Sequence, residues 1–166
     1  MIADDHPRTL AQDAVVSCRR EGLTIATAES CTGGLVAAAF TAIEGSSDVF
    51  ERGFVTYSNA AKMDLLGVPE ALLATVGAVS EEVAVAMAKG ALEHAPVQIA
   101  VAVTGIAGPG GGSPSKPVGL VHLAVARAGH VIRHERCLFA GDRDAIRNAA
   151  TVGALRLLAR AAADVP

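Results

Sequence analysis

The sequence predicts an α/β protein, a three-layer α/β/α sandwich around a mixed, mostly parallel sheet of about five strands. Three observations predict it. Helical and apolar strand-like segments alternate along the chain. The segment VQIAVAV at 97–103 is almost continuously apolar, which is typical of a strand buried on both faces. Two strand-like runs flank Ala128-Gly129, which predicts a C-terminal β-hairpin followed by a long helix.

The individual elements follow from apolar spacing and from residues that begin or end helices. Asn59 is a plausible N-cap of a helix ending at Leu66, and Ser80 caps a second helix with acidic residues in its first turn. The hairpin requires one antiparallel strand pair, whereas strands joined by helices are expected to be parallel. The predicted helices are 4–21, 33–43, 59–66, 69–73, 81–94 and 142–162, and the predicted strands are 23–28, 49–57, 97–103, 119–127 and 130–139.

Length and composition narrow the class of protein. A chain of 166 residues has the length of one domain, so residues 1–166 are predicted to form a single domain. Hydrophobic residues make up 51% and aromatic residues only 3%, with one tyrosine and no tryptophan. A net charge of −3 and so few rings argue against a nucleic-acid partner and against an anionic membrane surface.

The cysteines and the N-terminal residues indicate a compartment. The three cysteines are odd in number, widely spaced and without a C-x-x-C pair, which fits reduced thiols. The first ten residues, MIADDHPRTL, contain no apolar signal region. We therefore expect a cytoplasmic protein. The five histidines show no ligand spacing, so no metal site is predicted.

In sheets of this type, functional sites form in loops beyond the carboxyl ends of parallel strands. The first such loop is 28–34, AESCTGG, in which Ser30 precedes two glycines. Free amides at a helix start can bind an oxyanion, which suits Ser30 as a nucleophile and Cys31, Thr32, Gly33 and Gly34 as substrate contacts. A helix cap is the commoner role for a serine or threonine in such a loop, and Cys31 is a rival nucleophile.

The second loop leads from Tyr57 through Asn59 to Lys62, about one turn into a helix. A positive helix end and burial both disfavour an ammonium group, and a neutral lysine is a base suited to a serine. The alternatives are a solvated surface Lys62 and a half-buried Tyr57 that only packs.

The third loop, 104–117, follows the most buried strand and is rich in glycine and proline. Its pattern is neither a Walker A loop nor a dinucleotide fingerprint, but its amides are suited to cradling a phosphate. Thr104 at the strand tip is suited to relaying a proton or orienting a lysine. The alternative is a flexible connector, although long irregular loops tend to be functional. The candidate binding residues in this loop are Gly105, Gly108 and Gly110.

Arg143 and Arg147 are four residues apart and share one face of the last predicted helix. Two guanidinium groups on one face suit a phosphate. A salt-bridged exposed face with Asp142 and Asp144 is the alternative, and the sequence does not separate the two.

Together these segments resemble the C-terminal domain of the competence/damage-inducible protein CinA, a family that is also found alone as nicotinamide-nucleotide amidase. The resemblance covers most of residues 10–160. One departure is Ser115, where the family often carries an acid. The matching segments are TAESCTGG (27–34), GFVTYSNAAKMDLLGV (53–68), VGAVSEEVA (76–84), AVTGIAGPGGGSPSKPVGLV (102–121) and GDRDAIR (141–147).

The resemblance implies an amidohydrolase that converts nicotinamide mononucleotide into nicotinic acid mononucleotide and ammonia in pyridine nucleotide recycling. It implies a serine–lysine mechanism without metal or cofactor, in which Ser30 resembles the nucleophile, Lys62 the base and Thr104 a supporting hydroxyl. Tyr57 would line the same site.

Two other functions are also compatible with the sequence. A non-catalytic nucleotide-binding module, or an amidase of another small phosphorylated carboxamide, would share the same residues. The expected partners are a small nucleotide substrate and a second copy of the chain, because symmetric dimers or higher oligomers are common.

Overall fold

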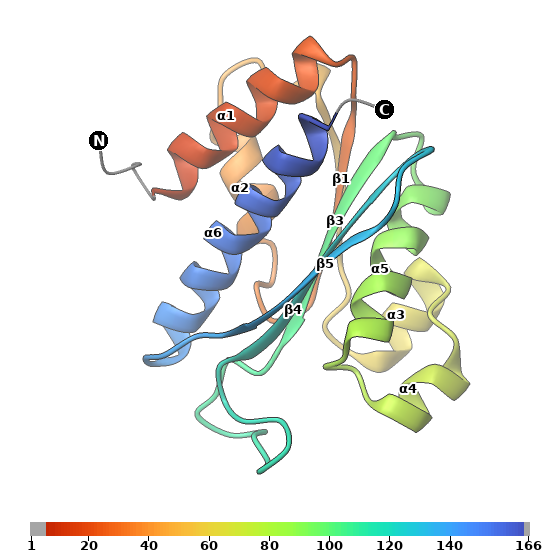
Figure 1. Cartoon of the computed structure of the whole chain (residues 1–166), viewed down its shortest axis with the longest axis vertical. Coiled ribbons are helices and arrows are strands. Elements are labelled where there is room, and N and C mark those ends of the chain that lie inside the picture. Colours follow the sequence, from red (N-terminus) through yellow and green to blue (C-terminus); the bar gives the residue numbers. More distant parts are fainter. Residues whose placement is uncertain (1–5, 165–166) are drawn as a thin grey trace.

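The computed structural model describes residues 6–164 and has three layers. A five-stranded sheet of order β2-β1-β3-β4-β5 forms the middle layer. Helices α1, α2 and α6 cover one face of the sheet, and α3, α4 and α5 lie on the other (Figure 1). The predicted α/β/α architecture is therefore confirmed, with the long α6 following the hairpin of β4 and β5.

The described elements lie close to the predicted ranges. Asp4, the predicted start of the first helix, lies outside the described residues. The helices are α1 (Pro7–Arg20), α2 (Leu35–Thr41), η1 (Ser46–Asp48), α3 (Asn59–Leu66), α4 (Glu70–Val76), α5 (Glu81–His94) and α6 (Arg143–Ala162); the strands are β1 (Ile25–Glu29), β2 (Phe50–Val55), β3 (Ile99–Gly105), β4 (Leu120–Arg127) and β5 (Arg133–Leu138).

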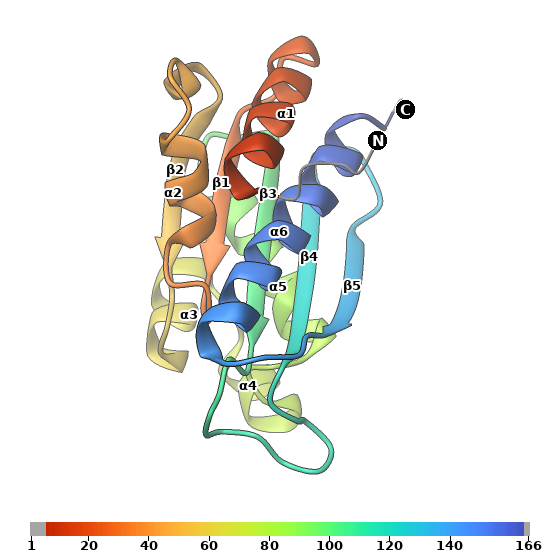
Figure 2. The same ribbon diagram turned by 90° about the vertical axis from the view of Figure 1, so that its left-hand side faces the viewer.

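The sheet is mixed, and β4 alone among its described strands runs against the others. β1 pairs in parallel with β2 and β3, to which helical crossovers connect the chain. The β3–β4 and β4–β5 pairs are antiparallel. The sequence predicted one antiparallel pair from the hairpin. The second pair arises because the irregular loop 106–119 joins β3 to β4, with no crossover helix between them. Figure 2 shows this loop below the carboxyl ends of the parallel strands.

The two faces of the sheet carry side chains of different size. Branched residues such as Ile99, Val101 and Leu123 face α1, α2 and α6. Alanines, among them Ala26, Ala100 and Ala124, face α5. Small side chains let a helix approach the sheet closely, which explains how a chain with few aromatic residues fills its core.

One glycine sets the distance between two helices on the alanine side. A Cβ atom at Gly90 in α5 would lie only 2.0 Å from the backbone oxygen of Leu66 in α3. The glycine therefore permits backbone contact between α5 and α3. This contact fixes the height of α3 above the sheet, and α3 carries Lys62.

Candidate active site

A cleft of about 210 Å³ lies at the carboxyl ends of β1 and β3, where such sheets place their sites. It brings together residues from all four of the predicted segments and from the linker before α5. Its lining residues are Ser30, Cys31, Tyr57, Asn59, Lys62, Ala78, Val79, Thr104, Gly105, Ala107 and Arg143.

Ser30 and Lys62 are in direct contact at the base of this cleft. The Nζ atom of Lys62 lies 3.1 Å from Ser30 Oγ, and the Lys62 residue is only 1% exposed. Within residues 6–164, no carboxylate lies within ion-pairing distance of this amine. Burial therefore lowers the pKa of Lys62 from its ordinary value, with only a small opposing effect from the nearby Cys31. A surface position for Lys62 is ruled out.

The other partners of the Lys62 amine are backbone carbonyl oxygens. Nζ donates to the oxygen of Thr56 at 2.8 Å and to that of Tyr57 at 3.3 Å. A neutral amine has two hydrogens and one lone pair. In the neutral form, if the two carbonyls accept both hydrogens, the lone pair is left to accept the proton of Ser30 Oγ.

Ser30 does not serve as the cap of α2, nor does Thr32. The N-cap residue is Gly34, which has no side chain to offer. Instead the buried Glu29 carboxylate accepts hydrogen bonds from the amides of Gly34 (3.0 Å), Val36 (3.1 Å) and Ala37 (2.8 Å). The capping role that the sequence suggested for Ser30 or Thr32 is therefore wrong, because Glu29 at the end of β1 fills it.

Some backbone amides of the first loop, 28–34, donate hydrogen bonds within the protein, and others do not. The Gly33 amide donates to the Ser30 oxygen at 3.1 Å, and the Gly34 amide is held by Glu29. Gly33 and Gly34 have φ angles of 59° and 103°, which explains why α2 begins later than predicted. Within the described chain, the amides of Cys31 and Thr32 donate to no other residue. Cys31 lines the cleft, so its amide remains as a candidate oxyanion donor, whereas Thr32 is fully buried and does not line the cleft.

Cys31 lines the cleft but is poorly suited to act as the nucleophile. Burial raises the pKa of its thiol to about 11, while a hydrogen bond from its own backbone amide and the charges of Arg147 and Lys62 oppose the rise only in part. The thiolate is the reactive form of cysteine, so a thiol held protonated is inert.

Thr104 lies in the cleft wall, and its hydroxyl is turned to a backbone group. Its Oγ1 donates to the carbonyl oxygen of Ala78 at 2.8 Å. The structure contains no hydrogen bond from Thr104 to Lys62 or Ser30 among its described residues. Thr104 thus connects β3 to the linker before α5, and it lies next to the first loop, because the Ser30 amide donates to the carbonyl oxygen of Val103 at 3.0 Å.

Tyr57 and Asn59 form the exposed rim. Tyr57 is 63% exposed, and its hydroxyl accepts a hydrogen bond from Arg143 at 3.0 Å. Asn59 lines the cleft as the first residue of α3. The predicted N-cap role of Asn59 is corrected by the structure, because the Ser58 side chain caps α3 by accepting from Ala61 at 3.0 Å.

Arg143 and Arg147 share a helix face but take different partners. Arg143 faces the cleft and donates to the Gly108 oxygen at 2.7 Å. Arg147 lies behind the first loop and donates to the oxygens of Cys31 at 3.0 Å and Thr32 at 3.2 Å. Its ion pair with Asp144 is long, at 3.8 Å, and Asp142 caps α6.

The predicted glycines are spread over the third loop. Gly105 lines the cleft, and Gly108 reaches it through Arg143. Gly110 lies farther out and lines a separate hollow formed by the loop itself. The structure therefore does not bring Gly110 to the cleft.

Three features of the structure were not predicted from the sequence. Glu29 was not considered as a cap, although an acid between a strand and a glycine-rich helix start is a signal for one. The linker residues Ala78 and Val79 carried no motif. His122 and His134 stack, with Nδ1 and Nε2 only 2.9 Å apart. Their contact depends on the register of the β4–β5 hairpin, which sequence spacing does not reveal.

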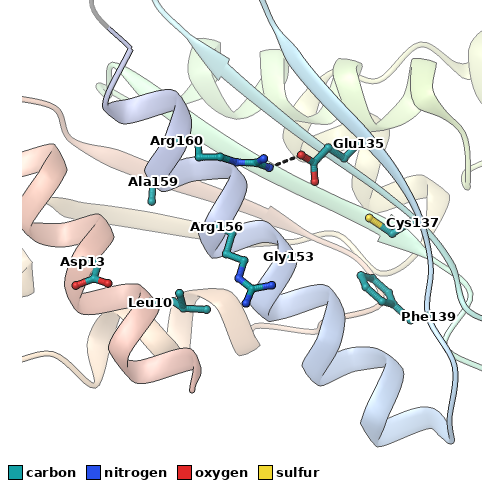
Figure 3. Close-up of a pocket in the computed structure, with 9 residues that line it drawn as sticks. All are labelled: Leu10, Asp13, Glu135, Cys137, Phe139, Gly153, Arg156, Ala159 and Arg160. Carbon is teal, nitrogen blue, oxygen red and sulfur yellow. Dashed lines mark hydrogen bonds and ion pairs between the residues drawn. The ribbon is translucent and has the colours of Figure 1, made fainter. Parts of the chain in front are cut away.

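A larger hollow of about 510 Å³ lies on the other side of the sheet, between α1, α6 and β5. Figure 3 shows apolar side chains such as Leu10 and Phe139 among those that line it, together with the ion pair of Arg160 with Glu135. Its cysteine, Cys137, has a pKa raised by burial and then by Glu135. The hollow is lined by Leu10, Asp13, Glu135, Cys137, Phe139, Gly153, Arg156, Ala159 and Arg160.

The described part of the chain has neither a metal-ligand cluster nor a membrane-spanning helix. Residues 6–164 contain no group of three His, Cys, Asp or Glu side chains arranged to hold a metal ion. The same residues form no helix that is both long and apolar enough to cross a membrane.

Comparison with known proteins identifies the family. Over 158 residues the chain is 52% identical to the nicotinamide-nucleotide amidohydrolase PncC of Escherichia coli K12, covering 95% of each chain. It is 59% identical over 143 residues to a CinA-like protein of Geobacter sulfurreducens, but spans only 34% of that longer relative. A crystal structure of the competence/damage inducible protein CihA from Agrobacterium tumefaciens superposes with a TM-score of 0.93 at 48% identity, covering 99% of each chain. The CinA C-terminal domain model matches residues 7–162, and the chain therefore belongs to that family.

Proposed function

We propose that this chain is an amidohydrolase that converts nicotinamide mononucleotide and water into nicotinic acid mononucleotide and ammonia, in pyridine nucleotide recycling. The name of the Escherichia coli relative, which matches over 95% of both chains, supports this substrate. The observation that carries the proposal is the buried Lys62 amine, which lies against Ser30 Oγ with no acidic partner in the described chain.

The first half of the reaction forms an acyl-enzyme. Lys62 Nζ takes the proton of Ser30 Oγ, and Oγ bonds to the carboxamide carbon while the carbonyl oxygen becomes an oxyanion. As the tetrahedral intermediate collapses, the carbon–nitrogen bond breaks. The proton on the Lys62 ammonium passes to the leaving nitrogen, which departs as ammonia.

The second half restores the enzyme. Water attacks the ester carbon, Lys62 takes a proton from that water, and the bond from carbon to Ser30 Oγ breaks. Oγ recovers its proton from Lys62, and the carboxylic acid product releases its proton to solvent and leaves as the carboxylate. No metal or cofactor takes part in this scheme, so a chelator is expected to leave the activity unchanged.

The amide of Cys31 is the proposed oxyanion donor, because those of Gly33 and Gly34 are already engaged and Thr32 does not line the cleft. Each such donor contributes about 3 kcal/mol to transition-state stabilisation. Thr104, whose hydroxyl donates to Ala78, is proposed to hold the linker before α5 in place at the cleft.

Substrate binding is assigned to the rim and the third loop. Arg143 is the proposed phosphate contact, since its guanidinium faces the cleft. Tyr57 and Asn59 would contact the ribose or the nicotinamide ring from α3 and the segment before it. Recognition depends on amides, hydroxyls and an arginine, because Tyr57 alone among the cleft-lining residues is aromatic.

Two other functions make different predictions. A non-catalytic nucleotide-binding module would bind the nucleotide and release no ammonia. An amidase of another small phosphorylated carboxamide would turn over that compound faster. A paired nucleophile and base favours catalysis over binding alone, since binding requires neither group.

The test is incubation of the purified chain with nicotinamide mononucleotide and measurement of both ammonia and nicotinic acid mononucleotide. Turnover of this substrate supports the proposal, and binding without product refutes it. A panel of carboxamides with and without a phosphate identifies a different substrate.

The setting of the enzyme is also proposed. One domain is expected to carry the whole activity, in a cytoplasmic homo-oligomer, a dimer or higher. Free thiols at Cys18, Cys31 and Cys137 suit a reducing compartment, and symmetric assemblies are common among soluble enzymes. Light scattering on the purified chain measures the oligomeric state.

A further inference from the structure

Lys116 is a cation of the third loop that the proposed chemistry leaves without a role. The residue is half-buried, and its Nζ atom donates to the backbone oxygen of Val76, the last residue of α4. Backbone oxygens at the carboxyl end of a helix carry partial negative charge, which suits an ammonium group. Within residues 6–164 this amine forms no ion pair, so its charge is committed to the end of α4.

The structure on both sides of this contact fits the amine. Lys116 ends a closed turn, in which the Ser113 amide donates to the Lys116 oxygen at 2.8 Å and the Lys116 amide donates to Ser113 Oγ at 3.1 Å. After α4 comes Gly77, where an added Cβ atom would lie 3.1 Å from Lys116 Nζ. The turn fixes the backbone of Lys116 and the glycine leaves room for its amine, so the contact is built into the fold of both segments.

The linker 77–80 between α4 and α5 belongs to no helix or strand and is held by side chains. The carbonyl oxygens of residues 76–78 accept hydrogen bonds from three different parts of the chain. Lys116 donates to the first, Ser80 Oγ to the second at 2.9 Å, and Thr104 Oγ1 to the third at 2.8 Å. The position of the linker therefore depends on these three donors.

The same linker supplies most of the aliphatic surface of the cleft. The cleft-lining residues with aliphatic side chains are Ala78, Val79 and Ala107, and Val79 has the largest of the three. In the proposed reaction Ser30 attacks a carbon that is attached directly to the nicotinamide ring, so the ring lies inside the cleft. Burial of its apolar atoms against aliphatic side chains favours binding. The linker is therefore the surface on which a ring is best accommodated.

We propose that Lys116 is a positioning residue that holds the linker 77–80 through the Val76 carbonyl, and that this linker is the wall on which the nicotinamide ring packs. The inference rests on the proposed function, because the ring enters the cleft only if the nucleotide is the substrate. The wall contacts the ring in the ground state and in the transition state alike. Loosening it therefore weakens binding, because the linker has to be ordered when substrate binds.

The test is steady-state kinetics on Lys116→Met, with the exposed Lys89→Met in α5 as the matched control. For Lys116→Met we expect KM to rise roughly 10-fold with kcat nearly unchanged, as for the loss of uniform binding. The increase should be the same for the nucleotide and for the nucleoside that lacks the phosphate, because the wall contacts the ring. Lys89→Met is expected to behave like the wild type, and Lys116→Arg, which keeps a charged donor, should restore most of the affinity.

A double-mutant cycle distinguishes positioning from a general structural role. Val79→Ala removes part of the wall and is expected to raise KM by itself. In the double variant with Lys116→Met, the increase in KM should be smaller than the product of the two single increases, because a truncated wall leaves less to position. If the methionine variant does not fold, Lys116→Gln keeps a neutral donor, and a KM increase of about threefold on both substrates is expected.

The outcomes separate the two proposals. If the wild-type chain releases no ammonia from the nucleotide, the proposed function fails and this inference falls with it. If the wild type is active and Lys116→Met raises KM for the nucleotide but not for the nucleoside, Lys116 is a phosphate ligand, and only the inference is overturned. A lower melting temperature with unchanged kinetics, or a loss confined to kcat, also overturns it.

Discussion

Two hollows of this molecule differ in size and in chemistry, and the smaller one holds the proposed active site. The hollow between α1, α6 and β5 encloses about 510 Å³, against about 210 Å³ for the cleft at β1 and β3. The larger one is lined by apolar side chains and by charged ones, among them the Arg160–Glu135 pair. The smaller one contains a buried amine against a hydroxyl. Convergent polar groups, rather than volume, mark the place where chemistry occurs.

The two regions also differ in what their charges do to stability. The Arg160–Glu135 pair is exposed, so it contributes little and costs little. Lys62 is buried with no acid beside it in the described chain, so its charged form destabilises the fold. A protein retains such a group where activity requires it, and the predictions below measure this contrast from the largest effect to the smallest.

Removing the nucleophile is expected to have the largest effect. Ser30→Ala should lower kcat by roughly 10⁴-fold or more, since no other group in the cleft is activated by Lys62. The melting temperature should stay near that of the wild type, because the substitution deletes one oxygen atom. Ammonia release and thermal unfolding measure the two quantities, and wild-type turnover by Ser30→Ala would exclude the serine mechanism.

Lys62→Met should abolish activity and raise stability at the same time. Methionine fills a similar volume without a buried charge, so we expect a higher melting temperature at pH 7, by about 2–4 °C for each kcal/mol gained. Lys62→Arg is the matched control, because it keeps a buried charge and should be both inactive and less stable. A lower melting temperature for Lys62→Met would mean that the amine stabilises the fold.

The pH dependence follows from the lowered pKa of Lys62. Only the neutral amine accepts the Ser30 proton, so kcat/KM should rise with pH and level off below pH 10.5, the ordinary lysine value. Between the lowered pKa and 10.5 the unfolded chain binds more protons than the folded one, so stability rises with pH over this window. The stability advantage of Lys62→Met should therefore shrink as the pH rises. A flat rate profile up to pH 10.5 would contradict the role of Lys62 as base.

Arg143→Met should have a moderate effect that depends on the substrate. With the nucleotide, KM is expected to rise about 10- to 100-fold, because a charge-assisted contact to phosphate is lost. With the nucleoside, which lacks the phosphate, the variant and the wild type should differ little. An equal loss on both substrates would assign Arg143 to the carboxamide end of the cleft.

Changes in the larger hollow should have the smallest effect. Glu135→Gln removes the exposed ion pair with Arg160 and should leave both kcat and KM within about twofold of the wild type. Stability should change by less than about 0.5 kcal/mol. A strong effect on kinetics would show that this hollow communicates with the cleft.

Local signals explain what the sequence predicted well. Ser80 and Asp142 begin α5 and α6 as expected, since a cap acts within one helical turn. Ser58 rather than Asn59 caps α3, an error of one residue between two side chains that both make good caps. The confirmed fold class follows from the alternation of apolar segments, which needs no knowledge of contacts.

Contacts between distant residues explain the rest. Arg147 contacts the carbonyls of Cys31 and Thr32 across more than a hundred residues of chain, which its local sequence does not reveal. The spacing of four residues from Arg143 suggested that both arginines bind one phosphate, but only Arg143 lines the cleft. The second antiparallel pair depends on how the loop 106–119 turns. Glu29 appears as a cap only once Gly33 and Gly34 bend the backbone back toward it.

The contact of Gly90 with Leu66 has a consequence far from the cleft. A single added methyl group in α5 would press on the backbone of α3 one turn beyond Lys62 and lift the amine from the serine. A displacement of 1 Å in such a pair costs on the order of 100-fold in rate. Larger residues in a hydrophobic interior would ordinarily add stability. At Gly90, however, the hydrogen atom in place of a side chain keeps α3 at the position that brings Lys62 to Ser30. Attempts to strengthen this enzyme by filling its core should leave that atom in place.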